Sequence, residues 1–254
     1  MPLLARPSGP RPRRPRKAVR ALPPMAIVGA TVEAKLGGVT VTALPEGALW
    51  IAESRALVVS DLHLEKGSSF ALRGQMLPPY DTHAVLMRLT DLMLRLSPEI
   101  IVSLGDSFHD GGGPARMDAR DRQLLSVLMS RCDWVWVEGN HDGKAPEILG
   151  GAVRDVLHLG PLVLRHHPTK DAAPGEIAGH LHPCAKVAGR GTAVRKRCFA
   201  LGHDRLVMPA FGAFTGGLNL CDDAFAPIFP DGATALVMGR EKVLPAPMQR
   251  LLPD

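Results

Sequence analysis

The chain has 254 residues, 46% of them hydrophobic, which suits one large domain with a sizeable core better than two small ones. Its net charge of +5 resembles that of a nucleic-acid-binding protein, but residues 1–24 alone contribute +7, which leaves −2 for residues 25–254. No apolar run approaches the ~20 residues of a membrane span, and no apolar signal segment follows the basic start, so we expect neither a membrane protein nor a secreted one.

Residues 1–24 contain seven prolines and no acidic residue, a composition typical of a disordered, basic Pro/Arg-rich arm. The prolines would break the amphipathic helix of an organelle presequence, and Met25 is an alternative start of the chain. We therefore assign the folded domain to residues 25–254. Its four cysteines form no Cys-x-x-Cys pair, which predicts the reduced thiols of a cytoplasmic protein.

The first half of the domain alternates apolar strands with amphipathic helices. Strands are predicted at residues 39–43, 48–52, 56–60, 99–104 and 134–137. The first two form a hairpin. Helices 81–96, which Asp81 can cap, and 118–130 separate the last three strands, an alternation that predicts parallel βαβ units.

After Gly150 the pattern changes to short strands without long helices. These are predicted at residues 153–157, 162–165, 176–179, 193–200, 206–208 and 233–238. We expect a second sheet, mixed or antiparallel, to pack on the first.

Acidic, amide and imidazole side chains follow the predicted strands at their ends. They are Asp61, His63, Asp106, His109, Asn140, His141, Asp142, His166, His167, His180 and His182. Because open α/β sheets place ligands at the carboxyl ends of their strands, we expect these groups to share one rim. Asp61 and His63 are two residues apart, which points both the same way if the strand continues.

The chemistry of this set favours a metal centre. Carboxylate, imidazole and amide ligands without thiolate suit a borderline-to-hard divalent ion such as Mn²⁺, Fe²⁺ or Zn²⁺. The number of ligands suits two ions ~3.5–4 Å apart, the arrangement used for phosphoester hydrolysis. A lone histidine is more often a surface or core residue, but five strand-end groups together favour the dinuclear interpretation. His141 can transfer a proton near neutral pH, and Asp142 can orient its imidazole.

The same motifs resemble those of the calcineurin-like metallophosphoesterase superfamily. They are Asp61-x-His63, Gly105-Asp106, Gly139-Asn140-His141-Asp142, a strand-terminal histidine, and Gly179-His180-x-His182. A narrower resemblance is to bacterial ligase-associated DNA damage response endonucleases. It is carried by residues 60–67, 77–81, 105–110, 176–183 and 209–217.

The resemblance implies a four-layer α/β sandwich, with two central mixed sheets flanked by helices and two metal ions, Mn²⁺ first, at the rim. In it Asp106 bridges the ions. The remaining ligands are Asp61, His63 and His182 for one ion, and Asn140, His166 and His180 for the other. A hydroxide between the ions attacks phosphorus, and His141, held by Asp142, protonates the departing oxygen.

The implied function is a metal-dependent endonuclease that cuts single-stranded DNA during repair, in functional partnership with a DNA ligase and a repair helicase or exonuclease. The alternative is a phosphoesterase of small molecules, such as a nucleotide or a pyrophosphate. A non-catalytic scaffold with this fold would be expected to lose His141 or several ligands, and all are present.

Several residues near these motifs have two interpretations. We prefer His166 to His167 as the ligand because it directly follows the strand. His109 either orients a ligand or touches substrate, and Arg73 either meets a phosphate or is solvated.

Other residues favour structural roles. Cys184 is expected to be a buried thiol, and Trp134 and Trp136 alternate with valines as core residues do. The run Arg195-Lys196-Arg197 fits a nucleic-acid contact and a solvated strand edge equally well.

Overall fold

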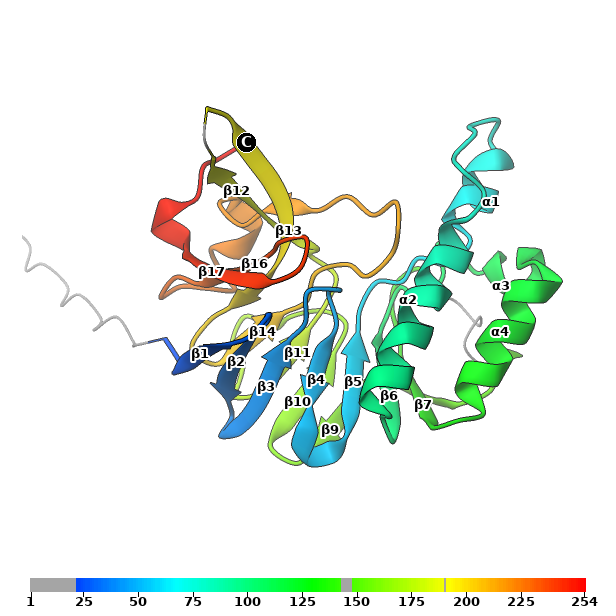
Figure 1. Cartoon of the computed structure of the whole chain (residues 1–254), viewed down its shortest axis with the longest axis horizontal. Helices are drawn as coiled ribbons and strands as arrows, with labels where there is room; N and C mark the ends of the chain where they lie inside the picture. The colour runs from blue at the N-terminus through cyan, green and yellow to red at the C-terminus, as the bar shows by residue number, and fades with distance from the viewer. Residues whose placement is uncertain (1–21, 143–147, 190) are drawn as a thin grey trace, which may run out of the picture.

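The computed structural model describes residues 22–142, 148–189 and 191–254, so the predicted arm lies outside the described residues up to position 21. Two sheets, packed face to face, form the centre of the molecule (Figure 1). The first sheet has the strands in chain order: β1 (Met25–Val28), β2 (Thr31–Leu36), β3 (Val39–Ala43), β4 (Leu49–Ile51), β5 (Ala56–Val59), β6 (Ile100–Leu104), β7 (Asp133–Val137) and β8 (Ala152–Arg154). Strands β1 to β5 pair antiparallel, whereas β5 to β8 pair parallel, as the βαβ pattern predicts.

The second sheet is mixed and has nine strands. They are β9 (Val156–Leu159), β10 (Leu162–Arg165), β11 (Glu176–Ala178), β12 (Pro183–Ala188), β13 (Ala193–Leu201), β14 (Arg205–Val207), β15 (Leu218–Asn219), β16 (Thr234–Met238) and β17 (Val243–Pro247). Strand β11 lies between β10 and β14, parallel to both, so the carboxyl ends of these strands share one edge, where His166 follows β10 and His180 follows β11.

Helices α2 (Asp81–Leu96) and α4 (Ala119–Met129) cover the outer face of the first sheet. Helix α4 begins as predicted, with the Asp118 carboxylate accepting a hydrogen bond from Arg120 N. The prediction that Asp81 caps α2 is wrong, because its carboxylate accepts from Gly67 N, at the start of the short helix α1 (Lys66–Ala71). This bond joins α1 to α2. A second short helix, α3 (Gly113–Arg116), precedes α4.

Three apolar clusters correspond to the spaces between the layers. Val58 and Ile177 belong to the cluster between the two sheets, and Leu89 and Trp136 to the one beneath α2 and α4. Phe225 belongs to a third, on the outer face of the second sheet. Each fully buried aliphatic or aromatic side chain contributes roughly 1.5–3 kcal/mol.

The α/β sandwich predicted from the sequence is confirmed, with an uneven helical cover. Among the described residues, the outer face of the second sheet carries the 3₁₀ turn η2 (Asp223–Phe225) in place of an α-helix. The predicted strand 153–157 is two strands, β8 and β9, which separate at Asp155 and join different sheets. No helix in the described part of the chain is long and apolar enough to cross a membrane.

Candidate metal centre

The strand-end residues of both sheets converge as predicted. Three groups of three residues each bring their potential metal-ligand atoms, one per residue, within 4.8 Å of one another. The groups are Asp61, His63 and His182; Asp61, Asp106 and His166; and His166, His167 and His180. Asp61 is shared by the first two groups and His166 by the last two. The three groups therefore form one continuous centre at the rim of the two sheets.

Asp106 lies between the two histidine clusters. Its Oδ1 atom is 3.5 Å from His166 Nε2, and its Oδ2 atom is 3.9 Å from His63 Nε2. The backbone N–H of His141 donates to Oδ1 at 2.9 Å. Burial alone would raise the pKa of the Asp106 carboxyl, but the adjacent His166 imidazole and the N–H of His141 outweigh burial and hold that pKa well below its usual value. A carboxylate with one oxygen toward each cluster has the geometry of a bridging ligand.

The first cluster surrounds Asp61, which is fully buried. Its Oδ1 atom is 3.0 Å from His182 Nε2. The other oxygen accepts hydrogen bonds from the Ser60 hydroxyl and from His180 N, which fix the carboxylate. Oδ1 is thus left to face the histidines.

The second cluster is arranged around the imidazole of His166. Its Nδ1 donates to the carbonyl of Leu104 at 2.8 Å, which leaves the lone pair on Nε2. Nε2 lies 3.2 Å from Asn140 Oδ1 and 3.3 Å from His180 Nδ1. Three ligand-type atoms from three segments therefore converge. The His167 ring is also close, 3.9 Å from that of His180 between centroids, but it is exposed whereas His166 is buried.

The backbone at the centre is unusual. Five of the eight non-glycine residues with positive φ among the described residues are candidate ligands. They are Asp61, His63, Asp106, His180 and His182, with φ between 43° and 69°. Left-handed backbone costs most residues about 1–3 kcal/mol and concentrates at functional sites. The strand that would point Asp61 and His63 the same way does not continue to them: β5 ends at Val59, and a left-handed turn brings the two side chains together.

The donor set fits two metal ions. Within the described chain, several buried polar atoms of the first cluster have no hydrogen-bond partner, among them Asp61 Oδ1, His63 Nε2 and His182 Nε2. Unpaired buried polar atoms are costly unless something binds them. Burial lowers the pKa of His63 to about 4, despite the neighbouring carboxylates, and lowers that of His180 to about 4 as well. Both imidazoles are therefore neutral at pH 7, as metal ligands must be.

The profile of the calcineurin-like phosphoesterase family matches residues 54–187, just over half of the chain, and this stretch includes every candidate ligand. The chain belongs to this family. Its members depend on two metal ions, which agrees with the candidate sites described above.

The chain is also similar to solved structures. The crystal structure of the nuclease MPE of Pseudomonas putida is 29% identical, covers 85% of this chain and 100% of its own, and has a TM-score of 0.67. More remote are Yfce, a phosphoesterase from E. coli (15% identity, 76% and 98% covered, TM-score 0.38), and the Aquifex aeolicus protein AQ665 (18% identity, 50% and 77% covered, TM-score 0.36). A search of curated proteins returned no match.

In this calcineurin-like phosphoesterase, His141 and Asp142 are not arranged as predicted. The expectation that Asp142 holds the His141 imidazole is wrong. Asp142 is buried and accepts from the backbone N–H groups of Phe108 and Gly139, each at 3.0 Å, and so it joins the two loops that carry Asp106 and His141. The partner of His141 Nδ1 is the carbonyl of His109, at 3.1 Å.

His141 itself lies beside Asp106. Because a carbonyl can only accept, its Nδ1 carries hydrogen and its Nε2 is the atom that faces the centre, 3.9 Å from Asp106 Oδ2. The His141 side chain is 43% exposed, so it can exchange protons with solvent. The His109 ring stacks on it, with centroids 5.8 Å apart and planes inclined by 14°. Sequence reasoning missed this orienting role of the His109 carbonyl, which no side-chain pattern could reveal.

The residues for which we expected structural roles are placed accordingly. Trp134, Trp136 and Cys184 are buried. Arg197 donates to the carbonyls of Ala210, Ala213 and Thr215 and so holds the loop that follows β14. Of the basic run, only Arg195 and Lys196 are exposed, and Arg195 bonds to Gly217 O and Asp254.

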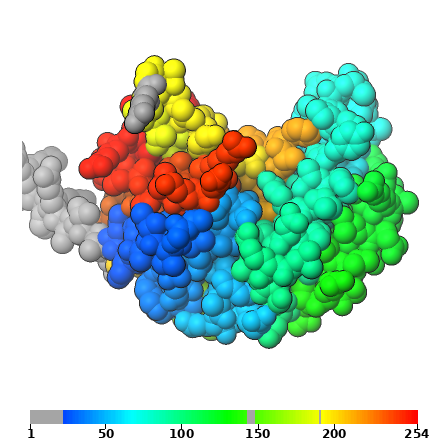
Figure 2. Space-filling view, in the orientation of Figure 1, coloured from blue at the N-terminus to red at the C-terminus, as the bar shows by residue number. Residues whose placement is uncertain are grey.

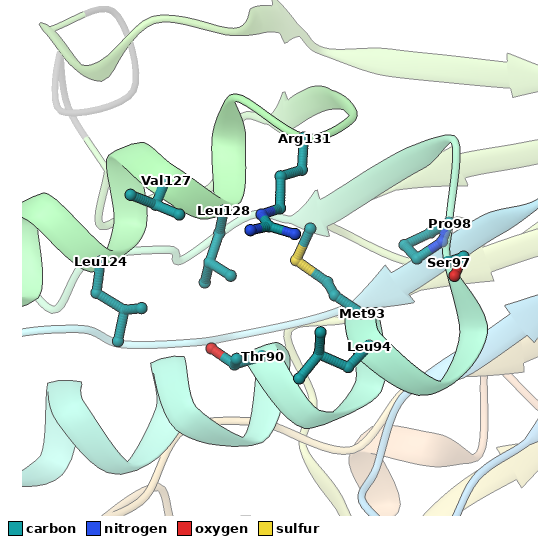
Figure 3. Close-up of a pocket in the computed structure, with 9 residues that line it drawn as sticks. All are labelled: Thr90, Met93, Leu94, Ser97, Pro98, Leu124, Val127, Leu128 and Arg131. Atoms are coloured by element: carbon teal, nitrogen blue, oxygen red, sulfur yellow. The ribbon is translucent and has the colours of Figure 1, made fainter.

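A groove between α2 and α4, with a volume of about 680 Å³, is separate from the metal centre (Figure 3). Leu124 and Leu128 of α4 point across it toward Thr90 and Leu94 of α2 (Figure 3). Its one ionisable residue is Arg131, and no candidate ligand lines it, so it offers no catalytic groups.

Proposed function

We propose that the protein is a metal-dependent phosphodiesterase that nicks single-stranded DNA during repair. The observation that carries the proposal is the position of Asp106, whose two oxygens face two histidine clusters while His141 lies beside it. The similarity to the Pseudomonas putida nuclease supports the step from phosphoester chemistry to nucleic acid.

The first ion would be held by Asp61, His63, His182 and Asp106, and the second by Asn140, His166, His180 and Asp106. We propose Mn²⁺ as the native ion, with Fe²⁺ or Zn²⁺ as alternatives, because carboxylate, imidazole and amide donors without thiolate suit these ions. Two bound cations would acidify water and stabilise negative charge on the phosphoryl oxygens.

In this proposal His141 donates a proton to the leaving group. The His109 carbonyl fixes the His141 ring, so that Nε2–H of the protonated imidazole points into the centre. From there it can protonate the departing oxygen, a contribution of typically 10²–10⁴ in rate. Asp142 contributes indirectly, since it ties the His141 loop to the Asp106 loop through backbone bonds.

The experiment is cleavage of a covalently closed single-stranded DNA circle in the presence of Mn²⁺, because only an endonuclease can linearise a circle. We expect linear product from the wild type and none from Asp106→Asn. Hydrolysis of nucleotides or pyrophosphate without cleavage of the circle would overturn the proposal in favour of a small-molecule phosphoesterase, with which the charge of −2 on residues 25–254 is compatible.

The cellular setting is part of the same proposal. The four cysteines are free, as in a reducing compartment, and we propose a cytoplasmic enzyme. A DNA ligase that reseals the nick and a helicase or exonuclease that processes the ends would be its functional partners.

A further inference from the structure

Helix α1 and the turn after it lie beside the proposed proton donor. The Phe70 ring of α1 is 5.5 Å from the His109 ring between centroids, and His109 stacks in turn on His141. On the other side, the Lys66 ammonium lies 5.7 Å from the centre of the Phe70 ring. A continuous row therefore leads from His141 to Lys66, and the backbone N–H of the exposed Arg73 donates to the carbonyl of Phe70 at 2.9 Å.

The row is electropositive at its outer end. Lys66 begins α1 and Arg73 closely follows its end, so both cations belong to one short segment. Burial lowers the pKa of His109, and the positive charges of Lys66 and Arg73 lower it further. Burial also lowers the pKa of Lys66, and the charge of Arg197 adds to this effect. Cations held near one another would be stabilised by an anion between them.

Nearby carboxylates are already engaged elsewhere. Asp110 pairs with Arg116 at 2.8 Å, and Glu65 accepts from the hydroxyls of Ser68 and Thr82 at 2.6 and 2.9 Å. Within the described ranges, neither Lys66 nor Arg73 forms a salt bridge. Their charges are therefore available to a ligand.

The segment that presents these cations is fixed to the rest of the molecule. Arg116 Nε donates to Ser68 Oγ at 3.0 Å, and Gly67 N donates to Asp81. Since the bond from the Thr82 hydroxyl to Glu65 also joins α2 to the start of α1, the backbone around Lys66 is held before any ligand arrives. A preorganised cation binds an anion at a smaller entropic cost.

We propose that Lys66 and Arg73 bind the phosphate that flanks the scissile phosphodiester on its leaving-group side. This inference rests on the proposed function, because the scissile phosphate must lie at Asp106 and the leaving group at His141. The flanking phosphate then falls beyond His109, where the two cations lie.

The occupant is a polynucleotide strand. Besides its cations, the segment from α1 to the start of α2 exposes the apolar side chains of Leu72 (74%) and Met76 (83%), and such surfaces suit the base faces of an unpaired strand. Figure 2 shows a wide hollow between this segment, in cyan, and strands β12 and β13, in yellow, open toward the top of the view. A small phosphomonoester would have nothing to place against Lys66 and Arg73.

The test uses trinucleotides of thymidine with two linkages, one of them a neutral methylphosphonate that is not hydrolysed. The full-length, Mn²⁺-loaded wild type is compared with the variant Lys66→Ala/Arg73→Ala, with the neutral linkage placed on either side of the phosphodiester. Full phosphodiester trinucleotides provide the reference rate. Arg120→Ala, which changes an exposed arginine of α4, is the matched control.

For the wild type and Arg120→Ala, we expect a neutral neighbour on the leaving-group side to lower kcat/KM roughly tenfold to a hundredfold, the range for a hydrogen bond to a charged group. In the double variant the all-phosphate substrate should be cleaved as slowly as the wild type cleaves the substrate with the neutral linkage. Making the linkage neutral should then lower the kcat/KM of the double variant no further. Bound metal and hydrolysis of bis-p-nitrophenyl phosphate, measured alongside, report on damage to the centre itself. Arg73→Gln, a single change at an exposed site, serves if the double variant does not fold.

The subsite is overturned if the neutral linkage lowers kcat/KM equally in the double variant and in the wild type. It is also overturned if the neutral linkage leaves the kcat/KM of the wild type unchanged. Both outcomes leave the proposed function intact, because the oligonucleotides are still cleaved. A wild type that cleaves neither trinucleotide nor circle overturns the proposed function, and the subsite with it.

Discussion

Gly139 provides a sharp test of the candidate metal centre, because a single added carbon at this position would displace the Asp106 carboxylate, the proposed bridge, without removing it. A Cβ atom there would lie 2.1 Å from Asp106 N and 2.5 Å from Asp106 Oδ1. Ordinary van der Waals contact begins at 3.4 Å, so Asp106 must move by roughly 1 Å to accept Gly139→Ala, and a misplacement of that size costs about 10²-fold in rate. The φ of Gly139 is not positive, so the effect is steric and not one of backbone strain.

We expect Gly139→Ala to bind fewer than two metal ions per chain and to lose about 10²-fold or more in kcat/KM toward bis-p-nitrophenyl phosphate. Overpacking should also cost about 1–3 kcal/mol of stability. For a chain of this size each kcal/mol lowers Tm by about 2–4 °C. Metal analysis, steady-state kinetics and a thermal melt measure the three quantities.

Gly111→Ala is the control, since a Cβ on Gly111, in the loop after His109, would meet nothing within 4 Å. It should match the wild type in all three measurements. If Gly139→Ala does not fold, Gly179→Ala takes its place, because its Cβ would lie 2.7 Å from Asp61 Oδ2 and disturb the first cluster. A Gly139→Ala protein with two ions and a kcat/KM within about threefold of wild type would refute the placement of Asp106 against this glycine.

The remaining predictions concern the charged and imidazole groups themselves. His141→Ala should keep both ions while DNA cleavage falls by roughly 10²–10⁴, with a smaller loss on bis-p-nitrophenyl phosphate, whose leaving group needs no proton; His158→Ala, at an exposed site on β9, is its control. Asp142→Asn should leave the ratio of these two activities unchanged, whereas a His–Asp dyad would predict a loss of about 10⁴ on DNA. Asp106→Ala should lose both ions together, and Asp91→Ala, at an exposed site on α2, neither. Metal at about 100 times its Kd should stabilise the folded protein by about 2.7 kcal/mol, so its removal by a chelator should lower Tm by about 5–11 °C. An unchanged Tm would contradict a metal site built into the fold.

Local periodicity predicted the elements whose burial is regular. Helix α2 buries Val85, Leu89 and Leu92 at helical spacing. It ends at Leu96, and the next residue, Ser97, adopts a left-handed conformation before Pro98. The division of residues 153–157 between two sheets was beyond prediction, because the choice of partner strand is a tertiary matter. Strand β17 was missed because Pro245 and Pro247 argue against a strand, although an edge strand tolerates them.

The candidate ligands could be selected from the sequence, but the way they are brought together could not be predicted. Their identities follow from residue chemistry at strand ends, which depends only on sequence order. The orientation of Asp61 and His63 depends on left-handed φ values that no local propensity favours. The role of Asp142 depends on a contact with Phe108, 34 residues away, and such long-range backbone bonds leave no trace in a single sequence.

The same hydrogen bonds between loops enforce the strained backbone at the candidate centre and fix the positions of its carboxylates. Left-handed Asp61 and His63 are held by bonds to other segments: His63 N donates to Asp106 O at 2.9 Å, and Gly212 N donates to Asp61 O at 3.0 Å. The first of these ties the loop after β5 to the loop after β6, so the two carboxylates cannot move independently. Since each strained residue costs about 1–3 kcal/mol, the conformation persists only because neighbouring loops enforce it. The scaffold thereby sets the positions of both carboxylates before any ion binds, and the close approach of Gly139 to Asp106 is one part of that enforcement.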